Sequence, residues 1–396
     1  MPTRPFDFRN REGRRLSGSL EMPEGVQRGW ALFAHCFTCG KKNLAAVRIA
    51  RTLASAGIGV LRFDFTGLGE SEGDFADSSF SMNVGDLVSA AHAMQAAGMP
   101  PDILIGHSLG GAAILAAKGD IASARAVATI AAPFDVAHLL HLLDPEGLAR
   151  LETQAQSLVQ VVGRPLTVGK KFVDDLRGLD QGVRIAALRR PLLLLHSPRD
   201  QTVDIENATH IFLAARHPKS FVSLDEADHL LSSRNDAEHA AKLIAAWASR
   251  YLPESSPEPA HADAVAEETR LGKFQLTLRA GGALWLADEP EPAGGLGSGP
   301  TPYNLLASAL AACTTMTLRH HADSKGWAVT RIRTAVNHRK DRQHSPADVF
   351  SCQISIEGSL DDMQRGQLLE VAQRCPVHRT LELGAWFESV TLEPST

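Results

Sequence analysis

Two patterns of hydrophobic and polar positions divide the chain. From about residue 14 to residue 250, short continuous apolar runs alternate with longer amphipathic or alanine-rich stretches. Continuous apolar strands that alternate with helices are typical of a mostly parallel sheet with helices on both faces. We therefore predict an α/β domain over residues 1–251. Its predicted strands read RLSGSLEM, WALFAH, GIGVLRFDF, DILIG, AVATIA, PLLLLHS and SFVSLD.

The alternation changes at two places. Residues 134–190 are longer than one crossover needs and carry helical pieces, including AHLLHLLDPEGLARLETQAQSLVQVV, so they predict either a cap insertion over the sheet or plain surface helices. Residues 252–267 are rich in Pro, Glu, Ser and Ala without an apolar period, which indicates a linker. In residues 268–396 strands and helices fall into separate blocks, which predicts an α+β domain.

Composition and charge exclude several classes of protein. The 396 residues are 44% hydrophobic and 21% charged, as in a folded globular protein, and the formal net charge is −5. Because the chain has no overall basic field, we expect no nucleic-acid partner and no anionic membrane surface as partner. The first residues are charged where a signal peptide needs an apolar core, so we expect a cytoplasmic protein.

Five cysteines are spread thinly over the chain, an odd number that argues against a secreted disulfide framework. We expect any chemistry they perform to be thiol chemistry or metal binding. Cys36 and Cys39 form a C-x-x-C pair, but no second pair follows at the spacing of a metal site. We therefore predict no metal centre and no cofactor. We rank a redox role for this pair below a role of its loop in binding an oxyanion.

Ser108 stands in the sequence GHSLG, directly after the apolar run DILI and directly before the helical run GAAILAAK. A sharp turn from strand to helix brings backbone segments close together, so the flanking positions need glycine, and the serine is left above the sheet at a helix N-terminus. The pattern indicates a nucleophilic serine. The alternative is a glycine-rich turn with a capping serine.

A serine nucleophile needs a base, and the base needs an acid that orients it. Asp200 follows the apolar strand PLLLLHS, and His229 follows the strand SFVSLD. All three residues therefore fall at the carboxyl ends of predicted strands, in the chain order Ser, Asp, His that G-x-S-x-G enzymes use. The alternatives are Asp204 in place of Asp200, and less plausible partners in His196, Asp225 and Asp228.

The tetrahedral intermediate of such a reaction needs two oxyanion donors. We expect the backbone N–H of Leu109 to be one of them. The second should come from the loop FAHCFTCGKKN, where Phe37 is our choice and Cys36 is the alternative.

Residues 14–250 resemble the α/β-hydrolase superfamily through GHSLG, the order of the three residues above and the stretch FDFTGLGESEG. The resemblance implies acyl transfer to water. Ser108 would attack, His229 would move the proton, Asp200 would fix the imidazole, and an acyl-enzyme would be hydrolysed. We expect a carboxylesterase that acts on small or medium acyl esters.

The second domain contains two cysteines in distinct settings. Cys313 lies in the helical run PTPYNLLASALAAC, on a face shared with Leu306, Leu310 and Thr317, so we expect it to point toward the core. Cys375 precedes a proline that can open a helix, and a helix N-terminus with nearby basic residues favours a thiolate. The alternative for each is a structural role, which we also assign to Cys352.

The stretches PTPYNLLASALAAC and QRCPVHRTL resemble the OsmC-like family, which includes the organic-hydroperoxide-resistance proteins. The resemblance implies that Cys313 reduces an organic hydroperoxide, that Cys375 resolves the product as a disulfide, and that the chain forms a homodimer. The order of the two domains also resembles a known class of bifunctional fusions. Peroxidase members carry a glutamate where this chain has Tyr303-Asn304, and Arg279 is our choice of activating arginine. A purely dimerising domain is therefore the competing interpretation.

Overall fold

The computed structural model describes residues 3–23, 27–36, 39–161, 164–253 and 262–388. The chain forms two compact units, residues 1–262 and residues 263–396. Each unit is described by itself below.

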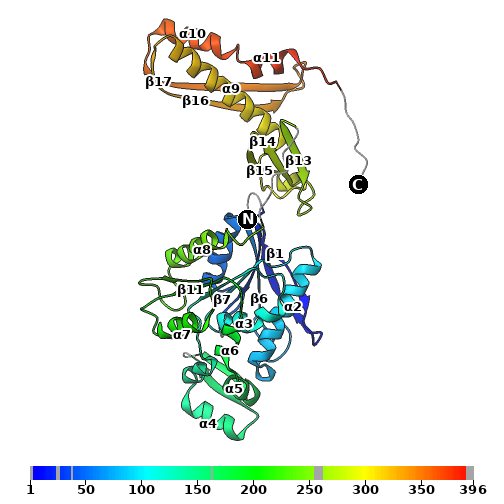
Figure 1. The fold of residues 1–396 in the computed structure, drawn as a ribbon. Helices are drawn as coiled ribbons and strands as arrows, with labels where there is room; N and C mark the ends of the chain where they lie inside the picture. Colours follow the sequence, from blue (N-terminus) through cyan, green and yellow to red (C-terminus); the bar gives the residue numbers. More distant parts are fainter. Residues whose placement is uncertain (1–2, 24–26, 37–38, 162–163, 254–261, 389–396) are drawn as a thin grey trace. The chain divides into compact units, whose positions relative to one another are not determined.

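Unit 1 is built on an eight-stranded sheet with the order β1-β4-β6-β5-β7-β8-β11-β12 (Figure 1). The six strands from β6 to β12 run parallel, whereas β1 and β4 pair antiparallel at one edge. The α/β fold predicted from the sequence is confirmed. The strands are β1 (Thr3–Pro5), β4 (Gly18–Glu21), β5 (Gly29–Ala34), β6 (Ile58–Phe63), β7 (Ile103–His107), β8 (Ala126–Ile130), β11 (Leu192–His196) and β12 (Lys219–Ser223), with the short pair β2 (Phe8–Arg9) and β3 (Arg15–Leu16) beside them.

Helices cover both faces of this sheet. α1 (Leu44–Ser55) and α8 (Arg234–Ala248) pack on each other and on one face, where they enclose an apolar core that includes Phe33, Ile49 and Ile105. α2 (Phe80–Ala96) and α3 (Leu109–Ala117) pack together and, with α6 (Gln181–Ala186) and α7 (Glu206–Ala214), form the second helical layer. Two short 3-10 helices, η1 (Phe75–Asp77) and η2 (Lys118–Asp120), complete these connections.

The segment between β8 and β11, predicted as a cap or as surface helices, contains both helices and a hairpin. Figure 1 shows α4 and α5 beyond α6, outside the sheet. Residues 156–161 were expected to be helical and form a strand instead. Ser157 and Val159 are buried while Leu158 and Gln160 are exposed, and this period of two, with β-branched valines, favours a strand. The elements are η3 (Val136–Leu142), α4 (Pro145–Thr153), β9 (Gln156–Val161), β10 (Arg164–Gly169) and α5 (Lys170–Arg177).

Unit 2 has separate blocks of strands and helices, as predicted for an α+β domain. β13 (Ala264–Glu268), β14 (Leu276–Ala280) and β15 (Ala283–Ala287) form one antiparallel sheet, followed by η4 (Glu291–Ala293). β13 begins inside the predicted linker of residues 252–267, because residues 264–267 pair with β14. The linker prediction was therefore too long at this end.

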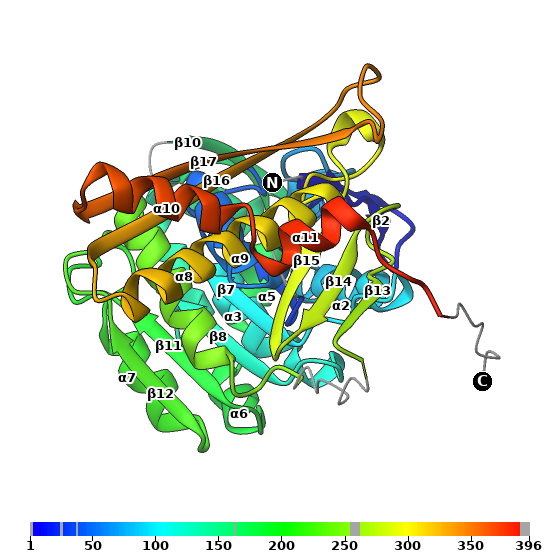
Figure 2. The same ribbon diagram turned by 90° about the horizontal axis from the view of Figure 1, so that it is seen from above.

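The remainder of unit 2 is a long two-stranded ribbon with helices packed on it. β16 (Ala328–Lys340) and β17 (Asp348–Ser359) pair antiparallel, and α9 (Pro302–Ser324) packs along the ribbon and against α10 (Asp362–Ala372) and α11 (Pro376–Leu383) (Figure 2). Leu318, Leu368 and Ala372 form a small core with partly buried neighbours. No residue of α11 is buried, although this helix is amphipathic.

Candidate active site

Ser108 lies at the sharp turn between β7 and α3. Its φ of 54° is in the left-handed region, which a residue other than glycine seldom adopts. A Cβ at Gly106 would meet the backbone of Gly110 at 2.5 Å, and a Cβ at Gly110 would meet the carbonyl oxygens of Ala34 and His35 at 2.4 Å. The flanking glycines are therefore needed for close backbone contact, as the sequence predicts.

The structure brings Ser108, Asp200 and His229 together. The Oγ of Ser108 lies 3.0 Å from Nε2 of His229, and Nδ1 of His229 lies 2.8 Å from Oδ2 of Asp200. Because an ionised carboxylate can only accept, Nδ1 carries the hydrogen and Nε2 is left to accept the serine hydroxyl. The side chain of His229 is 9% exposed, so the chain of hydrogen bonds is largely shielded from water.

Asp200 is held as an ionised acceptor. Burial alone would raise its pKa, but the hydrogen bond from His229 and the backbone N–H groups of Thr202 and Val203 bring the pKa below its ordinary value. These two N–H groups donate to Oδ1 at 2.8 and 2.9 Å, so Oδ2 is left for the imidazole. A carboxylate in this setting fixes the orientation of the imidazole.

Two of the alternative partners, Asp204 and Asp228, take part in local turns instead. Asp204 accepts from the N–H of Glu206, and Asp228 accepts from the N–H of Ser232. Nε2 of His196 donates to the carbonyl of Val203 at 2.8 Å, and burial lowers the pKa of this imidazole.

His107 was missed by the sequence analysis. Its Nε2 donates to the backbone carbonyl of His229 at 2.7 Å, so the residue before Ser108 holds the loop that carries the candidate base. Burial, followed by repulsion from His229, lowers the pKa of His107 to about 4. His107 is therefore a neutral positioning residue at neutral pH. Its contact joins residues far apart in the chain, and the local pattern carries no signal of it.

The candidate oxyanion donors lie on two segments. Leu109 is the first residue of α3, so its N–H has no acceptor within the helix. Phe37 lies outside the described residues. Cys36, the alternative, lies two residues after the end of β5, and its carbonyl accepts hydrogen bonds from Nδ1 of His35 and the N–H of Cys39.

A disulfide joins Cys36 and Cys39, whose Cα atoms lie 5.3 Å apart. This corrects the expectation that the cysteines take part only in thiol chemistry or metal binding. Two cysteines three residues apart are near enough along the chain to pair, and the N–H of Cys39 donates to the carbonyl of Cys36. The disulfide brackets the expected position of the second oxyanion donor.

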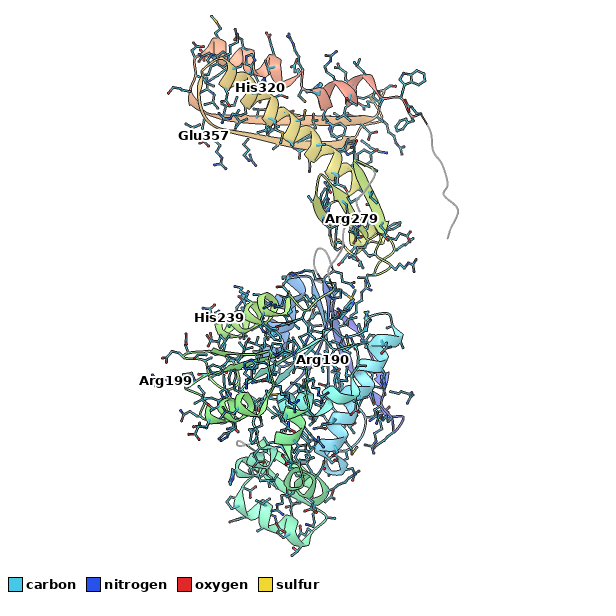
Figure 3. The ribbon with its side chains drawn as sticks, viewed as in Figure 1. Arg190, Arg199, His239, Arg279, His320 and Glu357 are labelled. Atoms are coloured by element: carbon cyan, nitrogen blue, oxygen red, sulfur yellow. A yellow bond between two sulfur atoms is a disulfide. The ribbon has the colours of Figure 1, made fainter. Side chains whose placement is uncertain are left out.

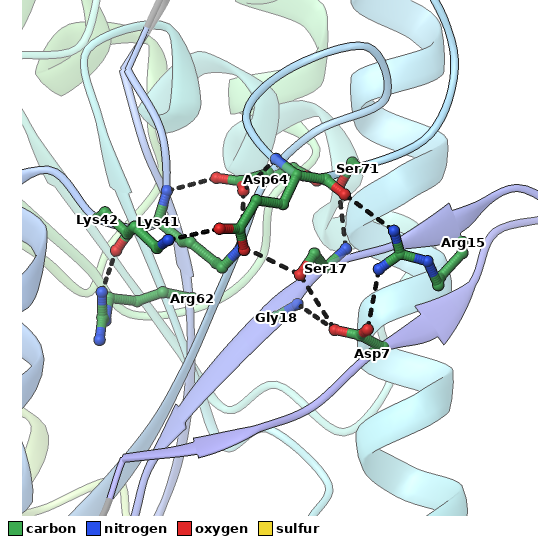
Figure 4. Close-up of polar contacts among 10 residues, drawn as sticks. Asp7, Arg15, Ser17, Gly18, Lys41, Lys42, Arg62, Asp64 and Ser71 are labelled. Atoms are coloured by element: carbon green, nitrogen blue, oxygen red, sulfur yellow. Dashed lines mark hydrogen bonds and ion pairs between the residues drawn. The ribbon is translucent and has the colours of Figure 1, made fainter.

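A buried ion pair anchors the segment that follows this disulfide (Figure 4). Nζ of Lys41, in a side chain only 3% exposed, lies 2.8 Å from Asp64 and 2.7 Å from Glu70. It also donates to the hydroxyl of Ser17, and the backbone N–H of Lys41 donates to Asp64. Breaking one partner of a buried pair leaves an uncompensated charge, so this network fixes the loop after β5 against the loop after β6.

Two depressions in unit 1 differ in their relation to Ser108. A small cavity of about 10 Å³ is lined by Leu109, His35 and Asn83, beside the candidate oxyanion donors. A much wider depression of about 900 Å³ lies along α2 and α5, near Asp86 and Lys170, and none of the three candidate catalytic residues lines it. Of these two depressions, the small cavity is the one whose described lining includes a candidate oxyanion donor.

The thiols of unit 2 are arranged differently from the expectation. Cys375 is fully buried at the N-cap of α11, and its Sγ accepts from the N–H of His378 at 3.3 Å. The side chain that faces it is Thr314, whose Oγ1 lies 3.5 Å from Sγ. Cys313 is only half-buried, because the inward face of α9 runs through Ala307, Leu310, Thr314 and Leu318.

The other residues considered for peroxide chemistry have structural settings. Asn304 forms a capping box with Thr301 at the start of α9. Arg279 lies on β14, paired with Val265 of β13 and Leu284 of β15 (Figure 3). Partial burial and the neighbouring Cys375 raise the pKa of Cys352.

Metal and membrane features were searched over the same described ranges. No cluster of three or more His, Cys, Asp or Glu side chains suited to a metal ion occurs among the described residues. Within that part of the chain, no helix is both long enough and apolar enough to span a bilayer.

Comparisons with known proteins agree with this architecture. Residues 39–175 match the model of the family described as serine aminopeptidase, S33, and residues 295–389 match that of the OsmC-like proteins. The esterase domain of a Rhodothermus marinus protein, known from a crystal structure, has 47% sequence identity to this chain. The match covers 63% of this chain and 99% of that one, with a TM-score of 0.54.

More distant relatives carry less information. Est1E of Butyrivibrio proteoclasticus, solved with ferulic acid, is 20% identical over 62% of this chain and 96% of that one, with a TM-score of 0.52, and shows the fold alone. The uncharacterized protein YfhR of Salmonella typhi is 23% identical over 183 residues, 45% of this chain. The chain spans 57% of the length of that curated relative.

The parallel sheet and the two family matches define a hydrolase of the α/β class joined to a second domain. The chain belongs to the α/β hydrolases, with esterases among its structural neighbours, and it carries a C-terminal OsmC-like domain. Both resemblances found in the sequence are confirmed.

Proposed function

We propose that unit 1 is a serine carboxylesterase that hydrolyses small or medium acyl esters. The observation that carries the proposal is the continuous hydrogen-bonded chain from Ser108 through His229 to Asp200. The 47% identical esterase domain supports ester hydrolysis over other reactions of the same fold.

In the acylation step, Oγ of Ser108 attacks the ester carbonyl while its proton passes to Nε2 of His229. Asp200 stabilises the imidazolium that forms. The negative oxygen of the tetrahedral intermediate accepts from the N–H of Leu109 and from a donor in the loop after β5. His229 then returns the proton to the departing alcohol, which leaves an acyl-serine.

In the deacylation step, a water molecule replaces the alcohol. His229 removes a proton from the water as it attacks the acyl-serine, and the same proton passes to Oγ of Ser108 when the acid leaves. The serine and the imidazole return to their starting forms, so each cycle consumes one ester and one water.

The proposal is tested with p-nitrophenyl esters of increasing acyl length. We expect wild type and a Cys313→Ser/Cys375→Ser variant to release phenol, and Ser108→Ala to lose about 10³-fold or more of kcat. The cysteine variant is the matched control, because it changes unit 2 alone. Equal turnover by Ser108→Ala and wild type would overturn the assignment, and so would inactivity of wild type on every ester.

For unit 2 we propose a dimerising role. The amphipathic helix α11 has no buried residue, and Leu383, Trp386 and Phe387 are 75%, 98% and 87% exposed. A two-stranded ribbon with so small a core needs further apolar cover. A second copy of the chain would supply that cover.

Thiol-dependent reduction of an organic hydroperoxide is the second candidate for unit 2. It is favoured by the position of Cys375 at the start of α11, where Sγ accepts a backbone hydrogen bond. The test follows consumption of cumene hydroperoxide with dithiothreitol as reductant. Loss of turnover in Cys313→Ser and in Cys375→Ser would support a working pair, whereas turnover unaffected by both changes would exclude it.

We also place the protein in the cytoplasm as part of this proposal. Three of the five cysteines are free thiols, which suits a reducing compartment, whereas the Cys36–Cys39 disulfide points the other way.

A further inference from the structure

Two buried polar atoms beside the candidate oxyanion donors have no hydrogen-bond partner among the described residues. They are Nε2 of His35 and Oδ1 of Asn83, in residues that are 3% and 4% exposed. Both residues line the small cavity next to Leu109. Buried polar groups are normally paired, so two unpaired atoms at one cavity indicate a hydrogen-bonding partner from outside the chain. The other walls are mainly apolar and include Phe65, Leu68, Phe75 and Ala113.

The chemical form of His35 follows from its other nitrogen. Nδ1 lies 2.8 Å from the carbonyl oxygen of Cys36, and a carbonyl can only accept, so the ring hydrogen is on Nδ1. Burial lowers the pKa of His35, which keeps the ring neutral. Nε2 is therefore an acceptor that offers its lone pair to the cavity.

Asn83 comes from a different element, the first turn of α2. Its side-chain oxygen is a second acceptor, and rotation of the amide by half a turn would offer N–H donors to the same space. A group that can both donate and accept fits either orientation. No carboxylate and no lysine or arginine is among the described residues that line the cavity, so the group is neutral.

The size and position of the cavity further limit which chemical group it can hold. A space of about 10 Å³ holds one group of the size of a water molecule. Leu109 and Cys36 line the same space, so its contents lie beside the candidate oxyanion donors.

We propose that this cavity is a subsite for a hydroxyl group of the ester substrate, held between His35 and Asn83. The inference rests on the proposed esterase function and names its preferred substrates as hydroxylated esters. The hydroxyl donates to one of the two acceptors, and an ester without it leaves both unpaired, so the enzyme discriminates in favour of the hydroxyl.

The test compares ester pairs that differ by one hydroxyl. Ethyl butyrate is compared with ethyl 2-hydroxybutyrate and ethyl 3-hydroxybutyrate, which place the hydroxyl on the acyl side, and with 2-hydroxyethyl butyrate, which places it on the alcohol side. Acid release is followed in a pH-stat. We expect kcat/KM of wild type to be about tenfold or more higher for one hydroxylated ester than for ethyl butyrate.

Variants assign the preference to the cavity. Asn83→Leu replaces an acceptor with an apolar side chain of similar size, and we expect the ratio of the two kcat/KM values to fall toward one. His35→Phe provides a second, independent variant with the same expectation. Ser89→Ala is the matched control, because it removes a buried hydroxyl from the same helix that bonds only to the carbonyl of Gly85, outside the cavity. It should keep the wild-type ratio.

The outcomes separate this inference from the function on which it rests. If no ester is hydrolysed, the esterase proposal fails. If the esters are hydrolysed but every hydroxylated ester stays within about threefold of ethyl butyrate, the cavity holds only water and the inference is overturned. A preference that survives both Asn83→Leu and His35→Phe overturns it as well.

Discussion

His107 shows how a single buried side chain supports the candidate site. The ring does not contact Ser108's hydroxyl, but it donates to the carbonyl of His229 and so fixes the loop from which the imidazole projects. A protonated ring at this place would bury a positive charge beside His229. Folding therefore selects the neutral form.

We predict that His107 makes folding stability depend on pH between about 4 and 6.5. The pKa falls from 6.5 in the unfolded chain to about 4 in the fold, so across this window only the unfolded chain binds the proton. The stabilisation is complete above pH 6.5 and is lost as the pH falls to 4, by roughly 3 kcal/mol. His107→Gln keeps an amide donor without the titration, so it should show a shallower pH dependence.

Urea unfolding at pH 7 and pH 5 measures this difference. Burial also lowers the pKa values of His35 and His196, but these act in both proteins, so the comparison isolates His107. The same pH dependence in wild type and His107→Gln would contradict the prediction.

The sequence alone was enough to identify the candidate site residues that lie at the ends of strands. Ser108, Asp200 and His229 each follow a predicted strand, and the parallel sheet brings such positions to one edge. His107, Lys41 and Asn83 were not found, because their roles come from contacts with segments distant in sequence. The side chain of His107 bonds a residue 122 positions away, and no local pattern encodes that contact.

Among elements, the contact between α3 and the end of β5 leaves no room for a side chain. A Cβ on Gly110 would meet two carbonyl oxygens at 2.4 Å, and these belong to backbone that cannot move aside freely. The helix that begins beside the candidate nucleophile therefore packs directly on the end of β5, before the loop that carries a candidate oxyanion donor.

We predict that Gly110→Ala destabilises unit 1 by about 1 to 3 kcal/mol and lowers esterase kcat, because the helix must move away from β5. Gly85→Ala is the matched control. A Cβ there meets nothing within 4 Å, and alanine in a helix is favoured by roughly 0.5 to 1 kcal/mol over glycine. Urea unfolding should therefore show opposite signs for the two variants. A stable, fully active Gly110→Ala variant would show that the contact between α3 and the end of β5 tolerates a side chain.

The disulfide between Cys36 and Cys39 can be tested by counting free thiols. Thiol titration of the unreduced protein in denaturant should find three thiols, because Cys36 and Cys39 are paired, and prior reduction should raise the count to five. A count of five without reduction would show that the pair is open.

Most elements were predictable because their hydrophobic periods are long or their strands are continuously apolar. The stretch QSLVQV was assigned to a helix because it continues a helical run, and four residues of alternating burial are too few to overrule that run. β13 was hidden in the linker because its backbone pairing, and not an apolar period, makes it a strand. On α9 the inward face was misplaced by one residue, since Thr314 rather than Cys313 packs inward.

For the whole molecule, the division at residue 262 separates the two proposed roles. All three candidate catalytic residues and both segments with candidate oxyanion donors belong to unit 1, and the exposed apolar residues at and after the end of α11 belong to unit 2. The homologous esterase domain from Rhodothermus marinus was solved without any such second unit, since 99% of that chain aligns with 63% of this one.

We therefore predict that the full chain is a dimer and that a chain ending at residue 253 is an active monomer. Light scattering gives the masses, and p-nitrophenyl butyrate gives the activities. Trp386→Ser/Phe387→Ser in the full chain should weaken the dimer without lowering esterase turnover. A monomeric full chain would refute the dimer, and a truncated chain that is folded but inactive would show that unit 1 depends on unit 2.

The position of this division also has a consequence for synthesis. A chain made from its N-terminus completes the hydrolase unit first, and residues 263–396 then take on the order of ten seconds to emerge. During that interval a nascent chain already holds every candidate catalytic residue but has no partner bound through unit 2. The candidate ester site can therefore assemble on a single, unpaired polypeptide that is still attached to the ribosome.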